Sequence, residues 1–207
     1  MSPECLIIFS RYPEPGKTKT RMIPALGKEG AAKLQRQMTE HTLHQARKLL
    51  SYRPLTVEVH FAGGDRQLMQ EWLGSDVTFY QQETGDLGQR MKSAIRRAFA
   101  AGMAKVVIIG TDCPDVNPSI LTEAFDALER QDLVLGPAED GGYYLIGLNC
   151  PIPQLFNQIQ WGTDQVLTQT KNIANKLGLD VYDLPLLADV DRPEDLPIWH
   201  KFCPQDG

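Results

Sequence analysis

Two short loops hold most of the side chains that could do chemistry. The first, residues 10–21, follows an apolar run and carries four cations: Arg11, Lys17, Lys19 and Arg21. Phosphate groups are bound by cationic donors and backbone N–H groups acting together, so this loop predicts a phosphate site. A solvated basic loop would have the same composition. We favour phosphate because the cluster directly follows a buried run in a chain whose net charge is −5.

The second loop, residues 110–115, follows another apolar run and places Asp112 near its start. A carboxylate at the end of a central strand is well placed for a hard divalent cation, which takes oxygen ligands and bridges to phosphate. An aspartate that only caps a turn is common at such positions. We assign the turn role to Asp115 and the metal role to Asp112. Cys113 is predicted to pack, because no histidine lies near it in the sequence to activate a thiol.

Two common phosphate-binding motifs are excluded. A Walker A loop would need a glycine where Arg11 stands, and a helix at once, which Pro24 and Gly27 interrupt. No G-x-G-x-x-G follows the first apolar run, so a dinucleotide-binding fold is not predicted.

These loops need a rigid framework, and the hydrophobic pattern predicts one. Strands are predicted over residues 5–9, 55–61, 77–80, 105–109, 133–135, 143–148 and 181–184. Helices are predicted over residues 29–50, 87–99 and 164–177, and from Asn117 and Pro193 onward. Because strands that alternate with helices form parallel pairs, we expect an α/β fold with a mostly parallel sheet covered on both faces. We expect one domain over residues 1–207, with ligands at the carboxyl ends of the strands.

Composition limits the partners. The apolar fraction of 42% is that of an ordinary globular protein, and the negative net charge argues against nucleic acid or an anionic membrane. No apolar run reaches the roughly 18 residues of a membrane helix, and no signal peptide is visible, so we expect a cytoplasmic protein. The four scattered cysteines are expected to be reduced thiols. His41 and His44 share a helix face without a third ligand, so no metal role is predicted for them.

Five motifs in the same order make the chain resemble the bacterial glycosyltransferase-like family DUF2064. They are PEPGKTKTR from residue 13, GDLGQRM from 85, GTDCP from 110, DGGYYLIGL from 140 and DVDRPEDL from 189. The resemblance covers nearly the whole chain. It implies the three-layer α/β/α GT-A fold of nucleotide-diphospho-sugar transferases. That family is similar to 2-phospholactate guanylyltransferase, molybdenum cofactor guanylyltransferase and CMP-Kdo synthetase.

The same resemblance implies roles for individual residues. The nucleotide-binding set is Ser10, Arg11, Lys17, Lys19, Arg21, Gly85, Asp86 and Gly88. The catalytic set is Asp112, Lys19 and Arg21, and the ligands of Mg²⁺ or Mn²⁺ are Asp112 and Asp191. The acceptor-binding set, Asp140, Gly141, Gly142 and Trp161, is predicted from the residues themselves, because paired glycines allow the backbone to approach a ligand closely.

Structural readings compete with several of these roles. Asp191 and Glu194 have the spacing of a capping box before the last helix. Asp140 and its two glycines would also suit a plain hairpin turn, and Trp161 would suit a hydrophobic staple. Arg90 would be a solvated residue of an ordinary helix. Spacing alone leaves these alternatives open.

Three functions remain open. The first is a glycosyltransferase that takes a nucleotide-diphospho-sugar donor, which the family description favours. The second is a nucleotidyltransferase that joins a nucleoside triphosphate to a phosphorylated small acceptor and releases pyrophosphate, which the cations of residues 10–21 favour. The third is a non-catalytic nucleotide-binding protein. The base, the sugar, the acceptor and the oligomeric state, a homo-oligomer included, are not determined by the sequence.

Overall fold

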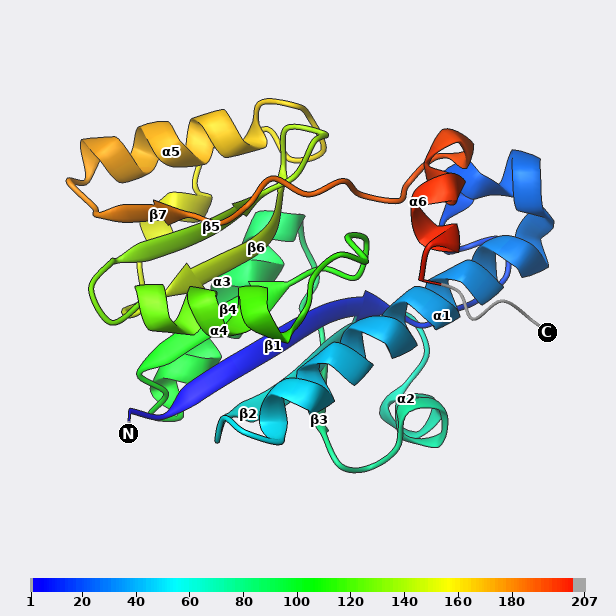
Figure 1. Ribbon diagram of the computed structural model, residues 1–207, viewed down its shortest axis with the longest axis horizontal. Helices are drawn as coiled ribbons and strands as arrows, with labels where there is room; N and C mark the ends of the chain where they lie inside the picture. The colour runs from blue at the N-terminus through cyan, green and yellow to red at the C-terminus, as the bar shows by residue number, and fades with distance from the viewer. Residues whose placement is uncertain (1, 203–207) are drawn as a thin grey trace.

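A seven-stranded sheet forms the middle layer of the computed structural model, which describes residues 2–202 (Figure 1). The strands are β1 Glu4–Arg11, β2 Thr56–Ala62, β3 Thr78–Gln81, β4 Lys105–Ile109, β5 Leu133–Pro137, β6 Tyr143–Leu148 and β7 Val181–Asp183. Their order across the sheet is β3-β2-β1-β4-β6-β5-β7. Each lies where the hydrophobic pattern predicts a strand, so the predicted α/β fold is confirmed.

Strand β6 is antiparallel to both of its neighbours, β4 and β5, whereas the other pairs are parallel. Residues 138–142 join β5 to β6 by a tight turn, closed by the N–H of Ala138 donating to the carbonyl of Gly142 at 3.1 Å. Gly141 has a φ of 85°, a conformation that side chains other than glycine rarely adopt. The carboxyl end of β5 and the amino end of β6 therefore reach the same edge of the sheet.

The helices are α1 Ile23–Leu50, α2 Arg66–Leu73, α3 Leu87–Ala100, α4 Pro118–Ala127, α5 Val166–Lys176 and α6 Leu196–His200. Gly27 interrupts α1 with a φ of 71°, so the regular part begins close to the predicted start at residue 29. Helix α2 is not predicted by the sequence pattern. None of the helices in the described part of the chain combines the length and apolar character that crossing a membrane requires.

Alternate residues of the strands point to opposite faces of the sheet, and each face has its own core. On one face, Leu6 and Ile8 belong to a buried cluster with side chains of α1, α2 and α4, such as Phe125. On the other face, Ile7 belongs to a cluster with side chains of α3 and α5, such as Met91. The three-layer arrangement is thus confirmed (Figure 1).

A third, smaller core fixes the C-terminal segment. Met22 and the first half of α1 pack against Val190 and against Trp199 of α6, all of them buried. In Figure 1 this is where α6 lies beside the start of α1, at the right of the view. Residues 189–191 are consequently held at the same edge of the sheet as the loops after β1 and β4.

The cysteines of the described residues are unpaired. Cys5 and Cys113 are buried, and Cys150 is exposed. Cys203 lies outside the described residues.

Candidate active site

A cleft of about 650 Å³ opens at the carboxyl ends of β1 and β4. It is bounded by residues 9–11 and 17–21, the loop from Gly110 to Cys113, the β5–β6 turn, residues 161–163 and residues 189–191. Of the predicted site residues, those that line it are Ser10, Arg11, Lys17, Lys19, Arg21, Asp112, Asp140, Gly142, Trp161 and Asp191. The fold thus brings together loops that are far apart in the sequence, as expected for an open α/β sheet.

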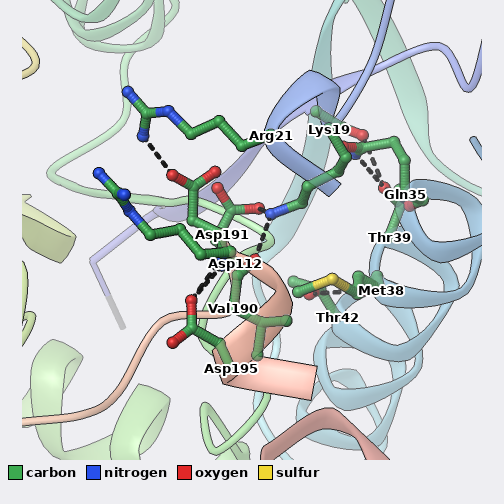
Figure 2. Close-up of polar contacts among 12 residues, drawn as sticks. Lys19, Arg21, Gln35, Met38, Thr39, Thr42, Asp112, Val190, Asp191 and Asp195 are labelled. Carbon is green, nitrogen blue, oxygen red and sulfur yellow. Dashed lines mark hydrogen bonds and ion pairs between the residues drawn. The ribbon is translucent and has the colours of Figure 1, made fainter. Parts of the chain in front are cut away.

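Lys19 is paired with Asp112, and both residues line the cleft (Figure 2). Its Nζ lies 2.8 Å from Oδ1 of Asp112 and donates to the carbonyl of Val190 at 2.5 Å. Lys19 has a left-handed backbone, with φ and ψ both 45°. Its side chain is only 4% exposed, whereas that of Asp112 is 51% exposed. A nearly buried ammonium is tolerated because it has an anionic partner and a carbonyl acceptor.

Arg21 is paired with Asp191, and both residues line the same cleft (Figure 2). The hydrogen bond to Asp191 and the charge of that carboxylate raise the pKa of Arg21 above its ordinary value. The guanidinium is 63% exposed and Asp191 is 29% exposed. Two cation–carboxylate pairs therefore stand side by side, each formed by one predicted phosphate ligand and one predicted metal ligand.

The reading of Asp191 and Glu194 as a capping box is wrong. The capping carboxylate belongs to Asp195, which accepts the N–H of Asp191 at 3.0 Å and the N–H of Arg192 at 2.7 Å (Figure 2). The side chain of Asp191 points instead toward Arg21. Its carboxylate is therefore not engaged at the helix start, and it faces the cleft.

The remaining cations of the first loop lie nearer to solvent. Lys17 pairs with Glu14 at 2.7 Å and is 69% exposed, and Arg11 donates to the carbonyl of Lys17 at 3.0 Å. The Ser10 hydroxyl forms a 2.8 Å hydrogen bond with the hydroxyl of Thr39 on α1. Ser10 therefore fixes the first loop against α1.

Gly85, Asp86 and Gly88 are not among the residues that line the cleft. The carboxylate of Asp86 accepts the N–H of Gln89 at 2.8 Å, and Oε1 of Gln89 accepts the N–H of Asp86 at 3.0 Å, so this pair caps α3. In their place Leu87 and Arg90 line the cleft. Arg90 is not simply solvated, because its Nε donates to the carbonyl of Gly85 at 2.9 Å.

Gly88 has a packing role that the sequence does not reveal. A Cβ added there would lie 2.6 Å from the indole ring of Trp161. Trp161 also meets Tyr143 edge to face, with 6.4 Å between the ring centroids. Trp161, Tyr143 and Leu87 all line the cleft and form an apolar wall there.

The β5–β6 turn joins two strands and also contributes residues to the wall of the cleft. Oδ1 of Asp140 accepts the N–H of Gly142 at 2.8 Å, which is the hairpin-turn role. Gly141 does not line the cleft; a Cβ there would lie 2.3 Å from the backbone oxygen of Asp164. Its carbonyl also accepts the N–H of Leu167 at 2.9 Å. Gly141 therefore allows close approach of the segment that leads into α5.

Asp189 lines the cleft and is missed by the sequence reasoning. Burial, together with the negative charge of Asp140, raises the pKa of Asp189 to about 6. The signal was the alternation in Asp189-Val190-Asp191, which places two carboxylates on the same side of an extended segment.

The residues present suit a divalent cation that also binds substrate. Within residues 2–202, no three His, Cys, Asp or Glu side chains are grouped closely enough to hold a metal by themselves. Asp112 and Asp191 offer carboxylate oxygens that are at least partly exposed. Magnesium usually takes one or two carboxylates and completes its shell with water and substrate phosphates, so this set fits Mg²⁺ or Mn²⁺.

Comparison with known families and relatives agrees with this picture. The family described as "Uncharacterized protein conserved in bacteria (DUF2064)" matches residues 42–163, more than half of the chain. A curated relative from Chloroflexus aurantiacus, named phosphoenolpyruvate guanylyltransferase, is 26% identical over 187 residues, which cover 88% of each chain. The predicted family resemblance is therefore confirmed.

Solved structures share the fold. A Desulfovibrio desulfuricans G20 protein described as a nucleotide-diphospho-sugar transferase is 34% identical, with a TM-score of 0.89 over 100% of this chain and 90% of that chain. CMP:2-keto-3-deoxy-manno-octonic acid synthetase, solved with CTP, is 12% identical, with a TM-score of 0.59 over 97% and 98% of the two chains. The predicted GT-A fold and the prediction of a transferase are confirmed.

Proposed function

Because the chain belongs to the bacterial DUF2064 family, and a curated relative is a guanylyltransferase, we propose that it is a nucleotidyltransferase. It would join a nucleoside triphosphate, with GTP the first candidate, to a phosphorylated small acceptor and release pyrophosphate. The relative's name makes phosphoenolpyruvate the first acceptor to test.

One observation carries this proposal. The cations of residues 10–21 and the carboxylates of Asp112 and Asp191 lie in a single cleft at the carboxyl ends of the strands. A triphosphate concentrates more negative charge than a diphosphate sugar and needs more donors to neutralise it. Besides Lys19 and Arg21, the cleft offers Arg11, Lys17 and Arg90.

The chemistry this arrangement supports is displacement at the α-phosphorus. An oxygen of the acceptor phosphate forms the new bond to phosphorus, the bond to the bridging oxygen breaks, and pyrophosphate leaves. An acceptor phosphate is already an anion, so no side chain has to remove a proton. Lys19 and Arg21 would orient the phosphates and offset the charge that develops on the leaving group. A divalent metal held by Asp112 and Asp191 would add further charge neutralisation.

Glycosyl transfer is the second candidate. The 34% identical relative is described as a nucleotide-diphospho-sugar transferase, and the apolar wall formed by Trp161, Tyr143 and Leu87 would suit a sugar ring as well as a base. This reaction would use the same phosphate and metal ligands. The acceptor would attack the anomeric carbon of the sugar, the bond from that carbon to the diphosphate oxygen would break, and the nucleoside diphosphate would leave.

The deciding experiment is a panel of nucleotides offered to the purified protein with Mn²⁺. Thermal shift identifies the ligands, since a ligand of the native state raises its melting temperature. Pyrophosphate release from one triphosphate in the presence of phosphoenolpyruvate or a similar acceptor would support nucleotidyl transfer. Binding restricted to a nucleotide sugar would favour glycosyl transfer. Binding without turnover of either kind would leave the non-catalytic alternative.

A further inference from the structure

The two carboxylates proposed for the metal are already covered by the two cations proposed for the phosphates. Lys19 lies against Asp112 and Arg21 against Asp191, and Figure 2 shows both pairs meeting in one region of the cleft. Each residue thus has two assigned partners, its neighbour in the protein and a ligand. A metal that binds alone must compete with a cation, and a polyphosphate that binds alone must compete with a carboxylate.

The buried pair makes this competition costly for one ligand alone. The side chain of Lys19 is nearly inaccessible to water, and its ammonium contacts the carboxylate of Asp112 and the carbonyl of Val190. Drawing the carboxylate away would leave a buried cation without an anionic partner, which is strongly unfavourable. A phosphate oxygen arriving at the same time would replace that partner.

The exposed pair can separate more easily. The guanidinium of Arg21 is largely solvated and can turn from Asp191 toward a phosphate, for which its planar fork is well suited. Lys17 differs, because it pairs with Glu14 in the same loop and not with a carboxylate of the cleft. The dual use is therefore specific to Lys19 and Arg21 among the cations of that loop.

We propose that Lys19 and Arg21 act as built-in counter-ions of Asp112 and Asp191, so that the cleft takes metal and polyphosphate as one unit and binds either alone weakly. This inference rests on the proposed function only for the roles of those four residues in holding phosphate and metal. Each ligand raises the affinity for the other, and by linkage the factor is the same in both directions, typically about 5- to 150-fold.

Replacing an ordinary binding residue weakens the binding of a ligand, whereas replacing a counter-ion should strengthen it. Arg21→Gln removes the cation that covers Asp191, so Mn²⁺ alone should bind about two- to fivefold more tightly. This factor is the change in affinity that corresponds to the free energy of one exposed ion pair. Asp191→Asn releases Arg21, so inorganic tripolyphosphate in EDTA should bind more tightly by a similar factor. Electron paramagnetic resonance of free Mn²⁺ measures the first affinity, and calorimetry measures the second.

Charge-matched controls separate pairing from general electrostatics. Lys17→Gln removes a cation that is not paired with Asp112 or Asp191, and it should leave Mn²⁺ binding unchanged. Asp140→Asn removes a cleft carboxylate that bonds to a backbone N–H, and it should change tripolyphosphate binding less than Asp191→Asn does. Equal effects in variant and control, or weaker binding in Arg21→Gln and Asp191→Asn, would overturn the inference. Turnover of the wild type with nucleotide tests the proposed function separately, since neither binding assay depends on the base or the acceptor.

Discussion

The backbone N–H of Val190 donates to the carbonyl of Asp112 at 2.8 Å, joining the C-terminal segment to the loop after β4. The carbonyl of the same Val190 accepts the ammonium of Lys19. One residue of an extended segment therefore fixes both the candidate metal ligand and its counter-ion.

Replacing Asp112 by asparagine should abolish metal-dependent turnover while the fold persists. The amide keeps the shape and one acceptor but removes the charge that a metal and Lys19 both need. We expect turnover to fall by at least about 10²-fold, the scale on which electrostatic stabilisation of a transition state is lost. Steady-state kinetics with Mn²⁺ measures the turnover, and circular dichroism checks that the fold persists. Unchanged metal-dependent turnover would remove Asp112 from the site.

Trp199→Ala should weaken metal binding from a distance. Trp199 is buried against Val190 and the first half of α1, and truncating such a side chain costs about 3–5 kcal/mol. Because Val190 precedes Asp191, loosening α6 should lower the affinity for Mn²⁺. Leu49→Ala is the control: it is fully buried at the far end of α1, and it should destabilise the protein without changing Mn²⁺ affinity in the folded state. Equal Mn²⁺ affinities in the two variants would contradict this prediction.

Gly88→Ala should displace Trp161. The new methyl group would lie 2.6 Å from the indole ring, and overpacking of this kind costs about 1–3 kcal/mol. If Trp161 contacts the acceptor, the KM for the acceptor should rise more than the KM for the nucleotide. Lys92→Ala, an exposed change on the same helix, provides the reference. A variant with wild-type stability and wild-type KM values would show that the ring can move freely.

The stability of the protein should fall in acid through Glu4. This carboxylate accepts bonds from Arg53 at 2.6 and 2.8 Å and from Lys105 at 3.2 Å. Burial alone would raise the pKa of Glu4, but the bonds from Arg53 and Lys105 outweigh it and hold the pKa below its ordinary value. Because the folded state binds the proton less readily, the stabilisation is present above about pH 4.3, the ordinary pKa of glutamate, and is lost as the pH falls through the folded pKa.

Glu4→Gln isolates this contribution. At pH 7 the variant should lose roughly 3 kcal/mol of unfolding free energy, the low end for a broken buried pair, because Glu129 and Asp126 still contact Lys105 and Arg53. Urea titrations at several pH values should show the difference from wild type shrinking below pH 4 or so. A difference that stays constant with pH would show that the charge of Glu4 is not responsible.

Much of the framework can be predicted because the central strands of the sheet are continuous apolar runs in the sequence. Residues 5–9 and 106–109 are apolar on both faces, as expected for strands covered by two layers of helices. Helix α2 is not predicted because its eight residues bury only Met69 and Leu73. Two apolar positions are too few to show the hydrophobic periodicity of a helix. The side chain of Asp65, which accepts the N–H of Leu68, was the available signal for its start. The antiparallel direction of β6 follows from the short turn after β5, because a parallel pair would need a longer crossover. The position of β6 beside β4 is not encoded by any local pattern.

In the candidate site, too, some features follow from the local sequence and others depend on contacts made only in the folded chain. The position of the loop cations and Asp112 in the cleft is predictable because they follow buried strands, where ligands bind in such sheets. The roles of Gly85, Asp86 and Gly88 are not, since short polar residues and glycines serve helix caps and close packing as readily as ligands. The pairing of Lys19 with Asp112 depends on Val190, which is 171 residues from Lys19 and reaches it only in the folded chain.

The C-terminal segment also has a consequence for the order of folding. Asp191 and its partner Arg21 lie 170 residues apart, and the segment that carries Asp191 follows β7, the last strand of the sheet. Contacts between such distant positions form late, because closing a long loop must precede any gain from them. We therefore expect the sheet to form before the candidate site at its edge is complete. A product truncated just before residue 191 would keep all seven strands but lack Asp191, so Mn²⁺ binding would distinguish it from a chain that retains the segment.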